Sequence, residues 1–310
     1  MSIQGSRINP VLNGVLRKYL TADKQGLVAA ALAPRFKTAQ QCAPYYVFSK
    51  EAVLNVPRDI RRAPGGPHAE LPPTVLSPDS YMCLDYGVKA GVPDEIRAYY
   101  ANSFNADRVK VEAAAHVQLI KAEIRVKAKA THASVPTSSP VTKWDVGGSL
   151  PRLDVTKAKA ALNANSVGFE ANTMVISRDV ADVLINHADV KANVIAITGG
   201  NITYEQLRVY FGIEKLVIAG AFDNSVPDGQ TAVASRIWGD SVVLGYVDPG
   251  AADNFEAPTF IRAFEWITVA QMESYRDTDR KTDYHTSDLY LDEKLAAPDL
   301  GYHLSDVLAV

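Results

Sequence analysis

Gly168-Phe-Glu-Ala-Asn-Thr-Met-Val-Ile176 lies in the stretch that decides the fold, residues 154–247. Before it, an Ala-rich helix is expected over residues 155–164, because Asp154 is a good N-cap for this run. The β-branched and apolar run Thr173–Ile176 then predicts a short strand. Helix and strand therefore alternate here.

The alternation continues after this strand. Ser177 precedes a helix that we expect over residues 180–187, whose apolar residues share one face. The apolar run over residues 194–198 predicts a second strand, and Gly199-Gly200 would end it.

A third helix and strand follow. Thr203 and Gln206 have the spacing of a capping box, which predicts a helix that ends at Gly212. The apolar run Leu216–Ala219 then predicts another strand.

The last part of the stretch has two apolar runs, over residues 235–246, around Trp238-Gly239-Asp240. A turn at this tripeptide would make the segment a β-hairpin. We expect the Trp238 ring to help cover the apolar core of one sheet. The other members of that predicted core are Met174, Ile176 and Ile218.

Composition indicates an ordinary folded chain. With 310 residues, 47% of them hydrophobic, the chain can bury a sizeable core and is long enough for two domains. The apolar run over residues 27–33 is far shorter than the roughly 20 residues that a membrane span needs. Cys42 and Cys83 are the two cysteines, which fits a reducing compartment without a structural disulfide. We therefore expect no membrane association.

Charge is small in sum and uneven along the chain. The net charge of −3 argues against a dedicated nucleic-acid binder, which needs a concentrated basic surface. Residues 1–40 hold six basic residues against one acidic residue, a net charge of +5, whereas residues 271–310 hold four against nine, a net charge of −5. Solvated surface charge is the simpler interpretation, and attraction between the ends of different subunits is the alternative.

The first 44 residues have little that could pack alone. A helix is expected around residues 11–19, and it needs a surface to lie on. Residues 45–86 read as a ribbon whose strand-like ends, 45–48 and 81–84, flank a tip too rich in Pro and Gly for a helix. A two-stranded ribbon is marginal by itself, so it must pack back on its own domain or lie on a neighbour.

The longest helix should follow this ribbon. Pro93 opens a first helical region, and a second start near Asn105 leads into a helix up to about residue 130. Its expected apolar face is Val109, Ala113, Val117, Ile120 and Ile124. The loop over residues 131–148 is rich in Ser, Thr, Pro and Gly and predicts a domain boundary.

The C-terminal part predicts a long antiparallel pair. A loop over residues 248–258 leads into a strand-like run at 259–269, and a polar tip over residues 275–283 separates it from another at 284–291. The final residues, from Asp299 onward, should return to the domain of the central stretch as a short element.

No catalytic or ligand-binding constellation is recognisable. Asp283, His285 and Asp288 lie on one extended segment whose alternation separates them, so we expect no metal site. Gly199-Gly200 lacks the glycine spacing and lysine of a phosphate loop and reads as a plain turn. Ser134, Ser138 and Ser139 lie in no nucleophile-elbow context. We expect no catalytic residue, no cofactor and no enzymatic activity.

The order of elements resembles that of the major capsid proteins of tailed DNA bacteriophages, which have the Hong Kong 97-type fold. The residues that carry the resemblance are Gly168, Glu170-Ala-Asn-Thr-Met-Val-Ile176, Ile213-Glu-Lys-Leu-Val-Ile218 and Ile237-Trp-Gly-Asp240. The resemblance extends over nearly the whole chain. It implies an α+β fold with an N-terminal arm, an extended β-loop, a long spine helix, a peripheral domain and an axial domain.

The resemblance also implies domain limits. The arm would be residues 1–44 and the extended loop 45–88. The peripheral domain would comprise 89–150 and 258–292, with the spine helix at about 105–130, and the axial domain would comprise 151–257 and 293–310. In this family the extended loop lies over a neighbouring subunit. The implied inter-subunit contacts are Arg61, Arg62, Pro64, Gly65, Gly66 and His68 in the loop and Arg7, Arg17 and Lys18 in the arm.

The implied function is structural. The chain would form hexamers and pentamers of an icosahedral virion shell, assembled in the host cytoplasm, with portal, scaffolding and decoration proteins as partners. Double-stranded DNA would be bulk cargo. Because the loop begins near residue 45, we expect a separate scaffolding protein or none, and the family's lysine-to-asparagine cross-link finds no matching residues here.

Two alternatives stay open at this point. An encapsulin-like bacterial nanocompartment resembles the same fold but encloses protein cargo. A soluble α/β nucleotide-binding enzyme would use Gly199-Gly200. Electron microscopy separates the three as large shells, smaller cages and small oligomers.

Overall fold

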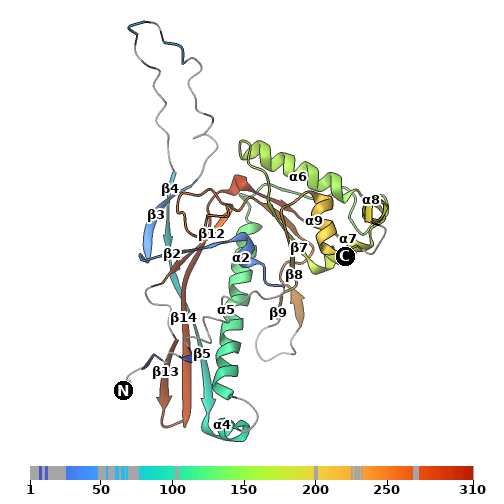
Figure 1. Ribbon diagram of the computed structural model, residues 1–310. Helices are drawn as coiled ribbons and strands as arrows, with labels where there is room; N and C mark the ends of the chain where they lie inside the picture. The colour runs from blue at the N-terminus through green and yellow to red at the C-terminus, as the bar shows by residue number, and fades with distance from the viewer. Residues whose placement is uncertain are drawn as a thin grey trace.

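The computed structural model describes residues 7–8, 11–12, 26–47, 54, 60–62, 64–66, 68, 77–101, 105–198, 202–224, 226, 231, 233–267 and 272–309. The described chain forms two lobes, and residues 60–62, 64–66 and 68 lie away from both (Figure 1). The first lobe is a six-stranded sheet with helices α4 (Asp94–Tyr100) and α5 (Ala106–Ala130). The second lobe is a five-stranded sheet with helices that follow α5 in the chain.

The first lobe is built around the strand β14 (Thr282–Leu295), which is long enough to pair with three others. It pairs antiparallel with β5, β12 and β13, while β2 lies parallel to β12 at one edge and β1 lies antiparallel to β13 at the other. The remaining strands of this sheet are β1 (Arg7–Ile8), β2 (Arg35–Thr38), β5 (Leu84–Pro93), β12 (Ile261–Trp266) and β13 (Met272–Asp277). The expected antiparallel contact of the 259–269 segment with β14 is present, but its partners are residues 291–295. The expected partner run, 284–291, pairs with β12 only at Leu291, so the predicted register is wrong.

The hairpin of β13 and β14 was not expected, because residues 275–283 read as a polar tip. The turn is shorter than that, at residues 278–281. Tyr275 pairs with Tyr284 and Asp277 with Thr282 across the hairpin. Charged residues are tolerated in β13 because this strand lies near the edge of an antiparallel sheet, and one face of such a sheet can be in contact with water.

Helix α5 begins where expected, behind Asn105, whose side chain accepts a hydrogen bond from the Arg108 N–H. Its buried face is different from the apolar stripe expected from the sequence. Val109 and Val117 are 46% and 45% exposed, and Ala113 is exposed too, so the first part of that stripe is wrong. Ile120 and Ile124 are partly buried against the core, as expected. The face against the sheet is composed of Val111, Ala115, Gln118, Ala122 and Val126.

A buried glutamine explains the difference. Gln118 donates from Nε2 to the carbonyls of Tyr86 (3.0 Å) and Ser287 (2.8 Å), and its Oε1 accepts from the Ser287 hydroxyl (3.1 Å). Because each of these polar groups is paired, burying the amide costs little. Small alanines on either side of Gln118 let the helix approach the sheet closely.

The second lobe has the strand order β6-β15-β11-β7-β8. Its strands are β6 (Thr137–Ser138), β7 (Thr173–Ser177), β8 (Lys215–Ala219), β11 (Val242–Gly245) and β15 (Gly301–Leu304), and its helices are α6 (Pro151–Asn165), α7 (Arg178–Asn186), α8 (Ala188–Thr198) and α9 (Tyr204–Phe211). A 3-10 turn, η1 (Pro298–Leu300), precedes β15 and returns the chain to this sheet. The expected return of the C-terminus is confirmed.

Several local predictions in this lobe are confirmed. Ser177 caps α7 by accepting from the Val180 N–H, and Thr203 and Gln206 form the full capping box of α9. Gly212 ends α9 with φ 62°, the left-handed conformation that favours glycine. Helix α6 begins earlier than expected, with Pro151 in its first turn.

Two predictions in this lobe are wrong. Residues 194–198 belong to helix α8 rather than to a strand. A short apolar run suits a strand or a buried helix equally, and here Asp189 favours the helix start. The segment 235–246 turns at Trp238-Gly239-Asp240 but forms no hairpin, since β10 (Ala234–Arg236) pairs with β9 (Phe222–Asn224) and β11 pairs with β7 and β15.

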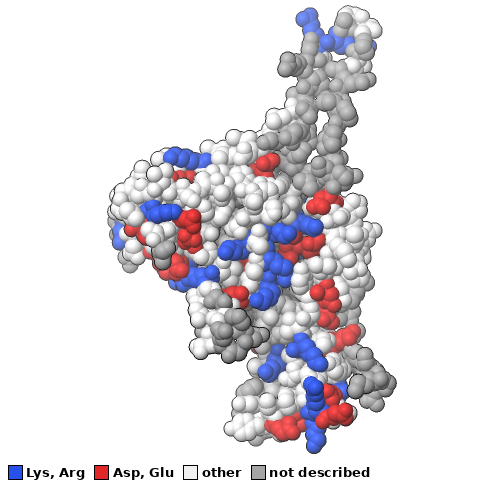
Figure 2. All heavy atoms as spheres, turned by 180° about the vertical axis from the view of Figure 1, so that it is seen from behind, with Lys and Arg blue, Asp and Glu red and all other residues white. Residues whose placement is uncertain are grey.

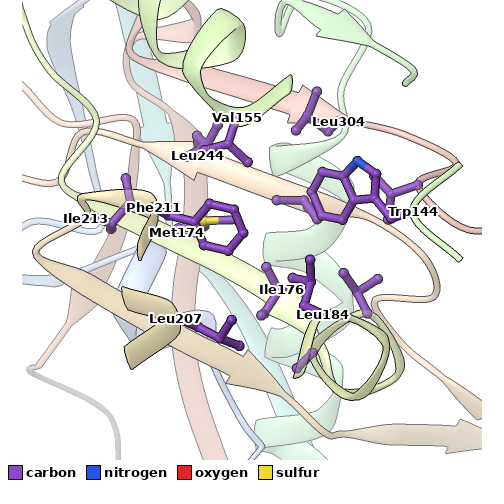
Figure 3. Packing of buried hydrophobic residues seen from close by; sticks show 14 of the residues in the cluster. Trp144, Val155, Met174, Ile176, Leu184, Leu207, Phe211, Ile213, Leu244 and Leu304 are labelled. Atoms are coloured by element: carbon purple, nitrogen blue, oxygen red, sulfur yellow. The ribbon is translucent and has the colours of Figure 1, made fainter. Parts of the chain in front are cut away.

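The five-stranded sheet has an apolar core on each face. Met174 and Ile176 are fully buried on the face covered by the helices, and Ile218 is partly buried there (Figure 3). Trp238 is buried too, but on the opposite face, together with Val175 and Val243. The sequence prediction placed Trp238 with Met174 and Ile176. That placement is wrong because Trp238 lies in the turn before β11, where its indole N–H donates to Glu123 of α5 on the opposite face.

Phe260 lies on that second face, flat against the backbone of the sheet. A Cβ built on Gly301 would lie 2.0 Å from the Phe260 ring, and one built on Gly245 would lie 3.1 Å from it. The two glycines are paired with each other across β11 and β15. They therefore leave the space that the ring occupies.

The two remaining short elements are α2 (Ala29–Leu32) and the ribbon of β3 (Cys42–Val47) and β4 (Ser77–Met82). The ribbon confirms the expected pairing at the base of the long loop, with Tyr45 opposite Asp79. Only residues 11–12 of the helix expected at 11–19 lie within the described residues. Among the described helices, none is long and apolar enough to cross a membrane.

Candidate functional site

The connection between β3 and β4 has described residues at 60–62, 64–66 and 68 that lie away from both lobes (Figure 1). Its base is fixed by aromatic side chains on the six-stranded sheet. The Tyr81 ring stacks on Phe264 with centroids 4.1 Å apart, and its hydroxyl lies 2.9 Å from Thr38 Oγ1. The Tyr45 hydroxyl donates to Asp79 Oδ2 (2.6 Å). Burial, followed by this carboxylate, raises the pKa of Tyr45, so its hydroxyl remains a donor.

The tip of the loop is basic. Arg61, Arg62 and His68 are exposed, and Figure 2 shows the Lys and Arg side chains at the end of the loop, far from both lobes. Arg62 Nη1 lies 3.3 Å from His68 Nε2, and Gly65 adopts φ 79°, a left-handed turn. Pro64 is exposed and Gly66 is half-buried. The predicted loop residues are therefore together at the tip, available for contact.

The outer face of the six-stranded sheet is acidic. Asp288 lies over Gly87 of the neighbouring strand, where an added Cβ would meet Asp288 Oδ1 at 2.7 Å. Burial, then the nearby carboxylates of Asp85 and Glu273, raise the pKa of Asp288. Three negative groups thus gather on a face that carries the opposite charge to the loop tip.

The far end of the first lobe holds an ion-pair cluster that sequence reasoning missed. Arg97 lies 2.7 Å from both Asp107 and Asp283, and Arg276 bonds to Asp283 at 2.9 Å. His285 Nε2 lies 2.9 Å from Asp107 Oδ1. Burial opposes ionisation of Asp107, yet its bonds to Arg97 and His285 lower its pKa overall. The cluster crosslinks α4, α5 and β14.

These contacts also place the three residues that were weighed as metal ligands. Asp283 and His285 belong to the ion-pair cluster, whereas Asp288 lies with Asp85 on the outer sheet face. Within the described ranges, no group of three His, Cys, Asp or Glu side chains is placed to hold a metal ion.

A serine and a histidine meet in a groove of about 700 Å³ between residues 144–150 and the α7–α8 junction. Ser149 Oγ lies 2.8 Å from His187 Nε2, and His187 Nδ1 accepts a hydrogen bond from the Asp189 N–H (3.2 Å). The neutral ring must therefore carry its proton on Nε2. Ser149 in turn donates to the Val146 carbonyl (2.8 Å).

This arrangement does not suit catalysis. A base must accept the proton of the serine hydroxyl, whereas His187 donates to that hydroxyl. The hydrogen bond instead joins the loop at 144–150 to the residue that precedes α8. It is non-local, so no spacing in the sequence could have indicated it.

The predicted arm residues are only partly described. Arg7 lies in β1, opposite Ser274 of β13. Arg17 and Lys18 lie outside the described residues, as do Gly199 and Gly200. The arm contacts, the domain limits and the nucleotide-site alternative stay predictions.

The sequence matches no protein-family model and no curated protein. Among solved structures, the chain is similar to a phage-related protein from Bordetella bronchiseptica, with a TM-score of 0.76 and 22% identity over 98% of this chain and 99% of that one. It is also similar to the capsid of Myoviridae phage XM1, with a TM-score of 0.54 and 10% identity over 92% and 93% of the two chains.

A third similar structure is a virus-like particle from Pyrococcus furiosus, with a TM-score of 0.55 and 10% identity over 95% and 98% of the two chains. At these identities the likeness concerns the fold. The α+β fold expected from the sequence is thereby confirmed, and the chain has the Hong Kong 97-type fold of phage capsid proteins.

Proposed function

We propose that this chain is the major capsid protein of a tailed double-stranded DNA bacteriophage. The observation that carries the proposal is the extent of the structural match, because nearly the whole of this chain superposes on nearly the whole of a phage-related protein. Copies would assemble as hexamers and pentamers of an icosahedral virion shell, assembled in the host cytoplasm.

Electron microscopy of the purified full-length chain tests this proposal. We expect closed icosahedral shells, or capsomers that close into shells when the chain is produced with the partner proteins of its own source. Portal, scaffolding and decoration proteins are the partners we propose, with DNA held non-specifically inside. A chain that stays monomeric or forms small oligomers under all these conditions would contradict the proposal.

Contact between copies would use the two oppositely charged surfaces. The basic loop tip, with Arg61 and Arg62, suits the acidic outer sheet face of another copy, with Asp85 and Asp288. Burying a cation beside a carboxylate of raised pKa relieves the repulsion within the acidic group.

A charge-reversal experiment tests this contact. Arg61→Glu with Arg62→Glu should abolish shell closure while leaving the subunit's melting temperature unchanged. Adding Asp85→Lys and Asp288→Lys should restore closure. The matched control is Arg108→Glu on the exposed side of α5, which should leave assembly intact. Closure by the loop double variant alone would overturn the assignment of these surfaces.

A nanocompartment shell is the second candidate, favoured by the likeness to the virus-like particle. The two proposals differ in cargo and size. Shells that contain DNA support the phage proposal, whereas small uniform cages that contain a co-purifying protein support the nanocompartment.

A further inference from the structure

A short segment that crosses the junction between the two lobes is held by a buried carboxylate. We call residues 26–33 the strap. Glu123, in the middle of α5, is 0% exposed. Its Oε2 accepts from the N–H groups of Val28 (3.0 Å) and Ala29 (2.8 Å), and its Oε1 accepts from the indole N–H of Trp238 (2.6 Å).

The carboxylate and the strap depend on each other. Helix α2 has four residues and no side-chain cap of its own, and so short a helix is not stable alone. Glu123 satisfies its free N–H groups from another element. In return, no ion pair joins Glu123 to a Lys or Arg in the described part of the chain, so these donors are what compensates its burial.

The strap touches both lobes. At its start, the Gly26 carbonyl accepts from the N–H groups of Gly220 (3.0 Å) and Ala221 (3.1 Å), next to β8 of the second lobe. At its end the chain continues into β2, a strand of the first lobe's sheet. Leu32, between these ends, is fully buried in the core that the two lobes share.

Close packing fixes the start of the strap. A Cβ on Gly26 would lie 3.0 Å from the backbone of Gly220, and Gly26 has φ 91°, which other residues rarely adopt. The strap is thus fixed at both ends and held in the middle by one ionisable side chain.

We propose that the strap holds the two lobes at one relative orientation and that its release from Glu123 lets that orientation change. The first 25 residues of the chain lead directly into Gly26, so whatever binds them can act on the strap. In a shell this would let one sequence occupy positions that are not identical, and this consequence rests on the proposed function. The existence of the strap does not rest on the proposed function.

Two measurements on the soluble full-length chain test the strap before any assembly. Nitroxide labels at Ala113→Cys in α5 and Thr156→Cys in α6, in a Cys42→Ser background, report the distance between the lobes. Amide hydrogen exchange at Val28 and Ala29 reports whether the strap is closed. Glu123→Gln keeps only one acceptor oxygen, so the strap N–H groups and the Trp238 indole N–H can no longer all be paired, and we expect exchange at Val28 and Ala29 to rise about ten- to a hundredfold. The distance distribution should broaden at the same time.

Two variants serve as controls. Glu112→Gln, on the same helix and in contact with Arg108, should change neither measurement. Trp238→Phe removes one donor but keeps both strap donors, so the strap should stay closed. Unchanged exchange in Glu123→Gln would show that Glu123 does not hold the strap. Faster exchange with an unchanged distance distribution would show that the strap opens without freeing the lobes, and would overturn the proposal.

If Glu123→Gln does not fold, Gly26→Ala replaces it, because the added methyl pushes on Gly220 without removing the carboxylate. The same faster exchange and broader distances are expected, and their absence would overturn the proposal. A chain that forms no shells could still have the strap, so the two proposals fail separately.

Discussion

The buried Glu123 at the junction of the lobes should make the stability of this chain depend on pH. Burial raises its pKa, opposed by the hydrogen bonds from Trp238, Ala29 and Val28. Because the pKa of Glu123 is raised in the folded state, its contribution to the free energy of unfolding is fully present below the unfolded-state pKa of about 4.3. It is lost as pH rises through the folded pKa.

We therefore compare the chain with Glu123→Gln by denaturant unfolding from pH 4 to pH 8. The difference in unfolding free energy between the two should fall as pH rises, since only the original chain titrates at this position. A difference that stays constant, or that grows with pH, would contradict the raised pKa.

Trp238 gives a second prediction at this scale. The ring is 1% exposed, so Trp238→Ala should lower the unfolding free energy by about 3–5 kcal/mol. Leu153→Ala is the control, because Leu153 is 46% exposed and should change stability by less than about 0.5 kcal/mol. Thermal melting of both variants tests this difference in stability. Equal melting temperatures would contradict the role of the Trp238 ring in the core.

At the scale of elements, the projecting loop should matter for assembly and not for folding. Deleting residues 61–73 leaves the base where Tyr81 stacks on Phe264 in place, so the melting temperature should stay within about 2 °C of the original. Assembly should stop at soluble capsomers or monomers. Normal particles from this deletion would remove the loop from the inter-subunit contacts.

Elements were predictable from the sequence where their signals are local. The capping box of Thr203 and Gln206 and the cap at Asn105 each involve residues three apart, and both were found. The buried face of α5 was missed because Gln118 and Glu123 are polar, and only distant partners such as Ser287 and Trp238 make their burial possible.

Strand pairing shows the same limit. The turn at Trp238 was recognisable, yet β10 and β11 separate after it to join different partners. Partner choice depends on contacts between residues far apart in the chain, which periodicity does not encode. The ion-pair cluster around Arg97 and the Ser149–His187 contact were missed for that reason.

At the scale of the whole molecule, the opposite charges of the chain's ends predict a salt-sensitive assembly. Residues 1–40 carry +5 and residues 271–310 carry −5, counted from the sequence. If the arm of one subunit docks on the acidic part of another, raising salt should weaken assembly, because exposed pairs are screened. Removing residues 1–20 should weaken it as well and reduce its salt dependence.

Light scattering of assembly across a salt series tests this, with the full-length chain beside the truncated one. A truncated chain that assembles with an unchanged salt dependence would assign the charged ends to solvated surface.

The Phe260 ring, pressed onto the backbone of two paired glycines, has a consequence for how this chain can drift in sequence. Gly301 admits no methyl group while the ring is present, since its Cβ would lie 2.0 Å away, whereas nothing lies within 4 Å of a Cβ on Gly147. In a library selected for soluble expression, Gly147→Ala should survive and Gly301→Ala should be lost. Gly301→Ala should reappear only together with a small residue at position 260. Positions 301 and 260 should therefore change together.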